Sequence, residues 1–267
     1  MEEIQEKKRI DMVKLKKTGA IVLPSIFTIA NMAFGFFAIL LASEGKFVQA
    51  AWFIVVSYAM DMLDGRVARL VHGESSFGVE IDSLSDWMSF CIAPAYLMYK
   101  LALKDYGVWG YPVTFLYVLC GALRLARFNV KSHFGGGSKD YFQGLPTPGA
   151  AGVMISFVLA YSLLEGEGGA RSIPGVSSFM PFVYAGIPFI VVTLALLMVS
   201  NAPYAAFKGD MIKLNSIKGV LLLTAMLSLI VAYPQDALFI FFSIYALSGI
   251  FGGLYNIVKG RPEARQG

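Results

Sequence analysis

Charged residues are scarce in this sequence. Asp, Glu, Lys and Arg together make up 15% of its 267 residues, whereas 57% are hydrophobic and the mean hydropathy is +0.64. Soluble globular domains carry roughly a quarter of their residues as charged side chains. This shortage of charge excludes an ordinary soluble domain and indicates a chain that is surrounded mainly by lipid. We expect no nucleic-acid partner for such a chain.

Cysteine and histidine are rare as well, with two of each. Cys91 and Cys120 both lie within apolar stretches, where we interpret them as packing residues and not as halves of a disulfide. His72 and His133 lie in polar connections. Neither residue type is therefore expected to bind a metal, which argues against a zinc site.

Long apolar runs are abundant. Each approaches the length of about 20 residues that a helix needs to cross a bilayer, and they lie near 19–42, 47–70, 81–102, 109–128, 147–164, 179–200, 217–233 and 236–258. We predict an all-α, polytopic membrane bundle of about eight transmembrane helices. Its transmembrane domain covers 19–258, an amphipathic juxtamembrane helix precedes it in 1–18, and a tail follows in 259–267.

The positions of Lys and Arg predict the orientation of this bundle. One side of the eight-span arrangement receives the basic N-terminal segment and Arg66, Arg69, Arg124, Arg127, Lys131, Lys139, Lys208, Lys213, Lys218, Lys259, Arg261 and Arg265. The other side receives only Lys46, Lys100, Lys104 and Arg171. Because short cytoplasmic loops carry the excess of cations, we predict a cell-membrane protein with both termini in the cytoplasm.

Four aspartates stand at unusual positions. Asp61 and Asp64 follow an uninterrupted apolar run, and Asp82 and Asp86 stand at the start of the next span. An ionised carboxylate at the bilayer centre costs about 2.5–3.5 kcal/mol on insertion scales, so four together need a compensating ligand. Helical spacing places each pair on one face, and antiparallel neighbouring helices bring both pairs to the same, cytoplasmic depth.

Oxygen ligands of this kind select hard cations. Four carboxylates suit two divalent ions, Mg²⁺ or Mn²⁺, and Ca²⁺ fits the same ligands. Small residues on the same faces, Gly65, Ala68 and Gly78, either serve helix packing or leave a cleft for a ligand. Magnesium held by few carboxylates completes its coordination with substrate phosphates, so phosphate transfer is the predicted chemistry.

Read in order, these residues form a pattern: Asp61-x-x-Asp64-Gly65-x-x-Ala68-Arg69, eight residues, then Gly78-x-x-x-Asp82-x-x-x-Asp86. It resembles the signature of the CDP-alcohol phosphotransferases and is complete over 26 residues. The resemblance implies a membrane enzyme that transfers a phosphatidyl or related group from a CDP-linked donor to an alcohol and releases CMP.

Other segments are similar to one branch of that family, the integral-membrane phosphatidylserine synthases. They are 23–31, 77–86, 89–95, 123–129, 144–148 and 204–208. Cys91 departs from the branch pattern, in which Gly is expected. The branch implies transfer of the phosphatidyl group from CDP-diacylglycerol to L-serine in phospholipid biosynthesis, by a homodimer surrounded by membrane lipids.

The resemblance also implies roles for matched residues. Asp61, Asp64 and Asp82 are the expected metal ligands, and Asp86 is the expected metal ligand and general base. The residues expected to bind CDP-diacylglycerol are Asn31, Asp61, Gly65, Ala68, Arg69, Ser76 and Gly78. A carboxylate beside cations is a reasonable acceptor for the proton of the serine hydroxyl.

The acceptor serine brings its own carboxylate and ammonium, which need partners. Arg124, Arg127 and Gln143 are candidates, because a guanidinium suits a carboxylate. Alternatively, both arginines anchor the cytoplasmic end of the fourth predicted span. The sequence leaves these two interpretations open.

Two other functions compete with a serine acceptor. A related enzyme would use glycerol 3-phosphate or inositol phosphate, and these phosphorylated acceptors demand a strongly basic pocket. A divalent-cation or proton-coupled transporter would also place acidic residues inside the membrane. We expect no acidic residue in the outer half of any span. Without such residues no acidic path would cross the membrane, which argues against a transporter.

Overall fold

The computed structural model describes residues 25–71, 76–133, 141–164, 172–205 and 232–258. The described chain is almost entirely helical, which confirms the all-α class. The predicted juxtamembrane helix in 1–18, most of the run 217–233 and the tail lie outside the described residues. The first described helix is Ser25–Ser43, and the elements after it are α2 (Phe47–Val71), α3 (Ser76–Asp86), η1 (Trp87–Ile92), α4 (Ala93–Leu101), η2 (Leu103–Trp109), α5 (Gly110–His133), β1 (Tyr141–Gln143), α6 (Thr147–Ser162), α7 (Pro174–Ala185), α8 (Ile187–Val199), β2 (Pro203–Ala205) and α10 (Pro234–Val258).

Several helices have the length and composition of membrane spans. Within the described residues, three qualify by these criteria: Ser25–Ser43, Phe47–Val71 and Leu103–Lys131. The pair α7 and α8 adds a fourth if it is one broken span, and α6 is apolar but shorter. The chain is therefore a helical membrane protein, while the total of about eight spans stays a prediction.

The run 179–200, for which the sequence predicts one span, is divided in the structure. Helices α7 and α8 meet at Gly186 and are bent by 83° relative to each other. Pro188, in the first turn of α8, has no N–H to continue the hydrogen-bond ladder of α7. Its ring also clashes with the carbonyl four residues earlier, so a sharp break is expected at this position.

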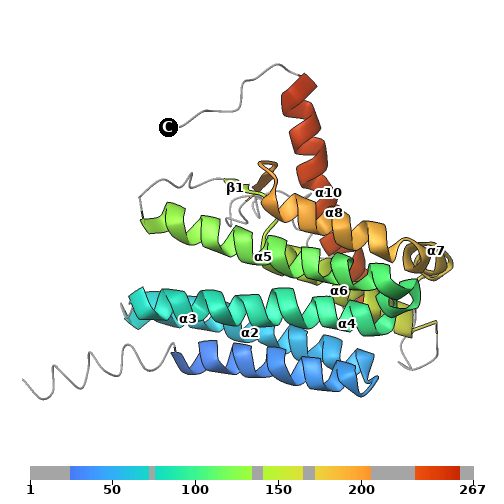
Figure 1. Cartoon of the computed structure of the whole chain (residues 1–267), viewed down its shortest axis with the longest axis horizontal. Helices are drawn as coiled ribbons and strands as arrows, with labels where there is room; N and C mark the ends of the chain where they lie inside the picture. The colour runs from blue at the N-terminus through green and yellow to red at the C-terminus, as the bar shows by residue number, and fades with distance from the viewer. Residues whose placement is uncertain (1–24, 72–75, 134–140, 165–171, 206–231, 259–267) are drawn as a thin grey trace, which may run out of the picture.

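Most of the helices run along the long axis of the molecule and form a bundle (Figure 1). The first helix, α2 and the continuous α3–η1–α4 rod lie together on one side, with α5 and α8 on the other, and α10 rises steeply from the bundle. Helix α6 lies at the centre, against α2 and α10, and every residue from Gly149 to Ala160 is buried. Gly149 and Gly152 allow the rings of Tyr245 and Phe242 in α10 to approach α6 closely.

The rod that carries the second aspartate pair contains a π-helical turn, η1, directly after Asp86. Pro94 has no N–H to donate to the carbonyl of Phe90, four residues earlier. The hydroxyl of Tyr117 in α5 donates to that oxygen instead, at 3.2 Å. Turns of this kind are frequent at functional sites, and this one joins the rod to α5.

A two-stranded sheet was not anticipated. Helix α5 continues past the predicted end of the apolar run 109–128 to His133, and β1 pairs antiparallel with β2, with Phe142 opposite Tyr204. Gly144 follows β1 with a φ of 79°, a left-handed conformation that favours glycine. The buried Tyr204 donates its hydroxyl to the Ala246 carbonyl at 2.9 Å and so ties β2 to α10.

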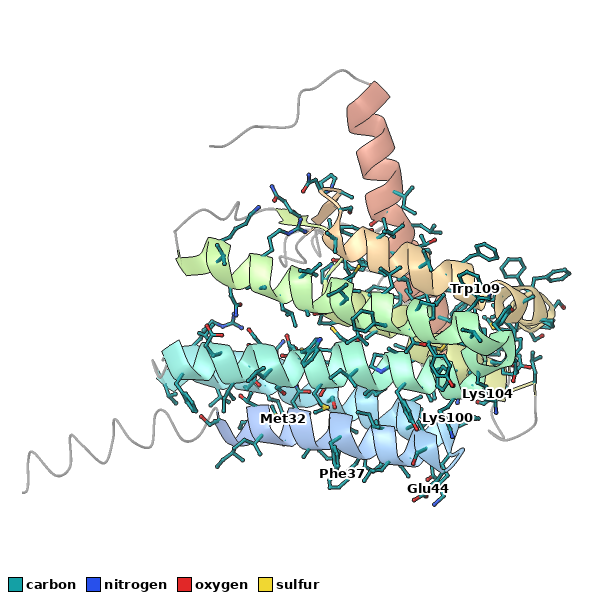
Figure 2. The ribbon with its side chains drawn as sticks, viewed as in Figure 1. Met32, Phe37, Glu44, Lys100, Lys104 and Trp109 are labelled. Atoms are coloured by element: carbon teal, nitrogen blue, oxygen red, sulfur yellow. The ribbon has the colours of Figure 1, made fainter. Side chains whose placement is uncertain are left out.

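Three of the four cations assigned by sequence to the outer side lie near one end of the bundle, and the fourth, Arg171, lies outside the described residues. Figure 2 shows Lys100 and Lys104 at the end of the bundle where Glu44 also lies. Lys46, in the same group, forms an ion pair with Glu44 at 2.7 Å. These positions agree with the predicted connectivity, although the side of the membrane stays a prediction.

Candidate active site

Hydroxyl groups fasten together the three helices that form the site. Ser57 of α2 and Ser89 of η1 both donate to the backbone carbonyl of Asn31, at 3.1 and 2.9 Å. Ser85 of α3 donates to the backbone carbonyl of Thr28 at 3.0 Å. These buried bonds hold the first helix against α2 and the α3–η1 rod without using a charged group.

The four predicted aspartates converge. Asp61 and Asp64 lie in the last turns of α2, and Asp82 and Asp86 lie at the end of α3, the helix that returns beside it. One carboxylate oxygen from each of Asp61, Asp64 and Asp82 lies within 4.8 Å of the other two. The side chains of Asp61 and Asp86 are in hydrogen-bond contact.

This cluster has the chemistry of a divalent-metal site. Asp64 Oδ2, Asp82 Oδ1 and Asp86 Oδ1 are buried and have no hydrogen-bond partner among the described residues. Buried carboxylates without partners are strongly unfavourable unless a cation neutralises them. An all-oxygen ligand set fits Mg²⁺, Mn²⁺ or Ca²⁺, and the described cluster contains neither Cys nor His.

Most of the residues expected to bind the nucleotide lie on α2 and α3, which carry the aspartates, whereas Asn31 lies on the first helix. Asn31 is fully buried, and both polar atoms of its side chain lack a partner in the described part of the chain. A Cβ atom added to Gly65 would meet no atom of the described residues within 4 Å, so these residues leave space beside Asp64. Ala68 and Gly78 are half-buried and Arg69 is exposed, while the side chain of Ser76 lies outside the described residues.

Arg127, one of the residues expected to bind serine, has a different set of partners. Its guanidinium donates to the backbone carbonyls of Val199 at 2.9 Å, Ser200 at 3.2 Å and Met198 at 3.3 Å, and to that of Gln143 at 3.2 Å. Carbonyls at the end of a helix have no intrahelical partner, and a cation there also complements the helix dipole. Arg127 therefore caps α8 and holds β1 beside it.

Gln143 is likewise engaged outside the aspartate cluster. Its backbone carbonyl accepts from Arg127, and its side-chain oxygen accepts from the Lys131 ammonium. The side chain of Gln143 is exposed. Arg127 thus anchors α8 and β1, and no contact joins Gln143 to the aspartates among the described residues. The assignment of Arg127 and Gln143 to serine stays a prediction.

Arg124, one helical turn earlier, is buried, with 9% of its surface exposed. Its Nη1 donates to Thr147 Oγ1 at 3.3 Å, and its buried Nε has no partner among the described residues. The Arg124 guanidinium is close enough to Asp86 and to the Cys91 thiol to interact with both electrostatically. The Cys91 thiol in turn lies close to both Asp86 and Arg124. The two arginines, three residues apart, are thus in different environments.

Sequence reasoning missed two neighbours of the cluster. Tyr58 lies one turn before Asp61, near both Asp61 and Asp86, and its hydroxyl donates to the Pro148 carbonyl at the start of α6. Thr28 hydrogen-bonds to Asp64. The i−3 spacing from Asp61 was a usable signal for Tyr58, whereas Thr28 comes from another helix and no spacing indicated it.

The expectation that the outer halves of the spans contain no acidic residue is wrong. Asp236 lies in the first turn of α10 and is fully buried. Its Oδ2 accepts from the Ile173 amide at 2.6 Å and from Ser172 Oγ at 3.1 Å. The carboxylate thus joins the start of α10 to the start of α7. These hydrogen bonds give Asp236 a structural role and do not indicate an ion path.

Comparison with known proteins supplies the family. A family model described as CDP-alcohol phosphatidyltransferase matches residues 21–184, a range that contains all four aspartates. This chain belongs to that family. Members of the family depend on divalent cations, in agreement with the oxygen-only cluster.

Several curated members of the family are similar to this chain over long ranges. A CDP-diacylglycerol–serine O-phosphatidyltransferase of Helicobacter pylori is 37% identical over 242 residues, which is 89% of this chain and 93% of the relative. An archaetidylserine synthase of Methanothermobacter thermautotrophicus is 36% identical over 201 residues, 73% and 74% of the two chains. A Saccharomyces cerevisiae CDP-diacylglycerol–serine O-phosphatidyltransferase is 37% identical over 152 residues, 52% and 53%.

Proposed function

We propose that this chain is a phosphatidylserine synthase of the membrane. It transfers the phosphatidyl group of CDP-diacylglycerol to the hydroxyl of L-serine and releases CMP, in phospholipid biosynthesis. The observation that carries the proposal is the convergence of Asp61, Asp64, Asp82 and Asp86 in a member of this family. Three of the four carboxylates have a buried oxygen without a partner among the described residues. Relatives named for serine transfer, similar over most of the chain, support the choice of acceptor.

The four aspartates would hold two divalent cations, Mg²⁺ or Mn²⁺, and Ca²⁺ fits the same ligands. Such ions neutralise the phosphates of the donor and the charge on the departing CMP. The residues assigned to the CDP group are Asn31, Asp61, Gly65, Ala68, Arg69, Ser76 and Gly78. Buried Asn31 is suited to this role, because its amide has both a donor and an acceptor to offer a base or a ribose.

Asp86 would act as the general base. The serine hydroxyl oxygen forms a bond to the phosphorus that carries diacylglycerol, the bond from that phosphorus to the CMP oxygen breaks, and Asp86 receives the hydroxyl proton. Its Oδ1 is buried and has no hydrogen-bond partner among the described residues, so it is available as an acceptor. The acyl chains of the donor stay in the bilayer.

We also propose the arrangement of the chain in the membrane. About eight spans over 19–258 place the aspartates, both termini and the tail 259–267 on the cytoplasmic side of the cell membrane, with 1–18 as an amphipathic helix at its surface. The asymmetric distribution of Lys and Arg supports this orientation. The family resemblance supports a homodimer.

The test is an acceptor panel with purified protein in lipid vesicles. CDP-diacylglycerol, a divalent cation and one acceptor are supplied, and CMP and the lipid product are measured. We expect phosphatidylserine from L-serine, with no product from glycerol 3-phosphate or inositol phosphate. Product from a phosphorylated acceptor alone would reassign the substrate, and metal flux across the vesicle without CMP release would favour a transporter.

A further inference from the structure

Thr28 of the first helix contacts both of the helices that carry the aspartates. Its side-chain hydroxyl hydrogen-bonds to the Asp64 carboxylate near the end of α2. Its backbone carbonyl accepts a hydrogen bond of 3.0 Å from the Ser85 hydroxyl of α3, and Ser85 directly precedes Asp86. Thr28 is buried, with 5% of its surface exposed. One residue outside the aspartate pattern thus connects the two aspartate pairs.

Helical spacing and packing direct Thr28 toward the site. Thr28 and Asn31 are three residues apart and share one face of the first helix, which is buried, whereas Ile26 and Ile29 on its other faces are exposed. The Asn31 carbonyl accepts from two serines of the neighbouring helices, at 3.1 and 2.9 Å. The packing of three helices therefore sets the position of the Thr28 hydroxyl before any ligand binds.

The Asp64 carboxylate needs a restraint of this kind. One of its oxygens lies within 4.8 Å of an oxygen of Asp61 and of Asp82, and like charges at such a distance repel one another. A Cβ atom at Gly65 would meet none of the described residues, so these residues do not confine Asp64 on that side. The Gly65 amide also donates to Asp64, but it belongs to the same helix and cannot fix the carboxylate relative to Asp82.

The bond from Thr28 leaves Asp64 able to bind a cation. An ionised carboxylate has two oxygens and about four lone-pair sites for hydrogen bonds or metal ions. Asp64 Oδ2 is buried and has no hydrogen-bond partner among the described residues, so it stays available. Carboxylates that bind metals commonly accept a hydrogen bond from a neighbouring side chain, and this bond fixes their orientation.

We infer that Thr28 is a positioning residue whose hydroxyl holds the Asp64 carboxylate in the orientation that binds a divalent cation. This inference rests on the metal site of the proposed function. The hydroxyl acts through Asp64 and not on the acceptor. Its loss should therefore weaken metal binding, while the KM for L-serine at saturating metal stays the same.

The experiment compares Thr28→Val and Thr28→Ser with the unaltered protein in lipid vesicles. Valine has the branched shape of threonine without the hydroxyl, and serine keeps the hydroxyl. Ser57→Ala is the control for helix packing, because Ser57 fastens the first helix through the Asn31 carbonyl, which keeps its bond from Ser89. Thr193→Val is the control for the substitution itself, since that exposed hydroxyl donates to a carbonyl of its own helix at 2.7 Å.

Three quantities are measured. Binding of Mn²⁺ to the protein without substrates is followed by electron paramagnetic resonance of the free ion. The Mg²⁺ concentration for half-maximal CMP release is determined at saturating L-serine, and the Tm is recorded without metal.

In Thr28→Val we expect Mn²⁺ affinity to fall by about 10- to 100-fold, the range for loss of a group that orients a metal ligand. The Mg²⁺ requirement should rise in parallel, while the Tm without metal falls only slightly. Thr28→Ser should bind Mn²⁺ nearly as well as the unaltered protein. Ser57→Ala should lower the Tm without changing Mn²⁺ affinity, and Thr193→Val should leave Mn²⁺ affinity unchanged.

An unchanged Mn²⁺ affinity in Thr28→Val would overturn the inference. An equal loss of affinity in Ser57→Ala would do the same, because it would attribute the effect to displacement of the first helix. If Thr28→Val fails to fold, Thr28→Ala takes its place, and an affinity equal to that of Thr28→Ser would exclude a role for the hydroxyl.

Failure of the proposed function gives different results. If the unaltered protein binds Mn²⁺ but forms no phosphatidylserine, the proposed reaction is rejected and the Mn²⁺ titrations still decide the role of Thr28. If the unaltered protein binds no divalent cation, the metal site and this inference are rejected together.

Discussion

Replacement of Arg127 by methionine tests whether this residue is a cap of α8 or a substrate ligand. The side chain donates four hydrogen bonds of 2.9–3.3 Å, three of them to carbonyls at the end of α8. A hydrogen bond from a charged donor contributes about 1.5–3 kcal/mol when isolated. Because these bonds share one half-buried group and water can reach part of it, we expect a net loss of about 3 kcal/mol.

The assay is thermal unfolding of the purified protein in detergent, monitored by circular dichroism. With about 2–4 °C per kcal/mol for a chain of this size, the Tm should fall by about 6–12 °C. Arg127→Lys retains the charge at the helix end and should show a smaller decrease. In the folded fraction, the KM for serine should be unchanged.

The opposite pattern would refute the capping argument. If Arg127→Met left the Tm unchanged and raised the KM for serine, the guanidinium would bind substrate and the contacts with α8 would carry little stability. A change in both quantities would show that α8 and the acceptor site are coupled. The control Lys104→Met should change neither quantity, because that side chain is exposed at the other end of the bundle.

Other changes test the site and the packing around it. Asp86→Asn should lower turnover by at least about 100-fold, the contribution of a general base, without altering the helical signal; near-normal turnover would remove Asp86 as the base. Chelation of divalent cations should stop CMP release, and added Mg²⁺ or Mn²⁺ should restore it; turnover that continues in excess chelator would contradict the metal assignment. Gly152→Ala places a Cβ atom against the ring of Phe242, so we expect a loss of about 1–3 kcal/mol and a lower Tm, whereas an unchanged Tm would show that α10 moves freely to make room.

Much of the fold could be predicted from local patterns. The apolar runs 19–42, 47–70 and 109–128 correspond to helices that qualify as spans, because hydropathy and length act within one segment. The break between α7 and α8 depends on Pro188 and was within reach of the sequence. The pairing of β1 with β2 was not, since it joins strands some 60 residues apart and neither strand carries a periodic pattern.

The sequence by itself determined the aspartate cluster. Helical periodicity decides which side chains share a face, and a short connection decides that two consecutive helices are antiparallel, so Asp61, Asp64, Asp82 and Asp86 had to converge. Only the tertiary structure separated Arg124 from Arg127. They are one turn apart on the same helix, and what distinguishes them is that α8 ends beside one and α6 begins beside the other. Contacts between distant segments decide that the Arg127 guanidinium is bonded to four backbone carbonyls, whereas Arg124 keeps a buried Nε with no partner among the described residues.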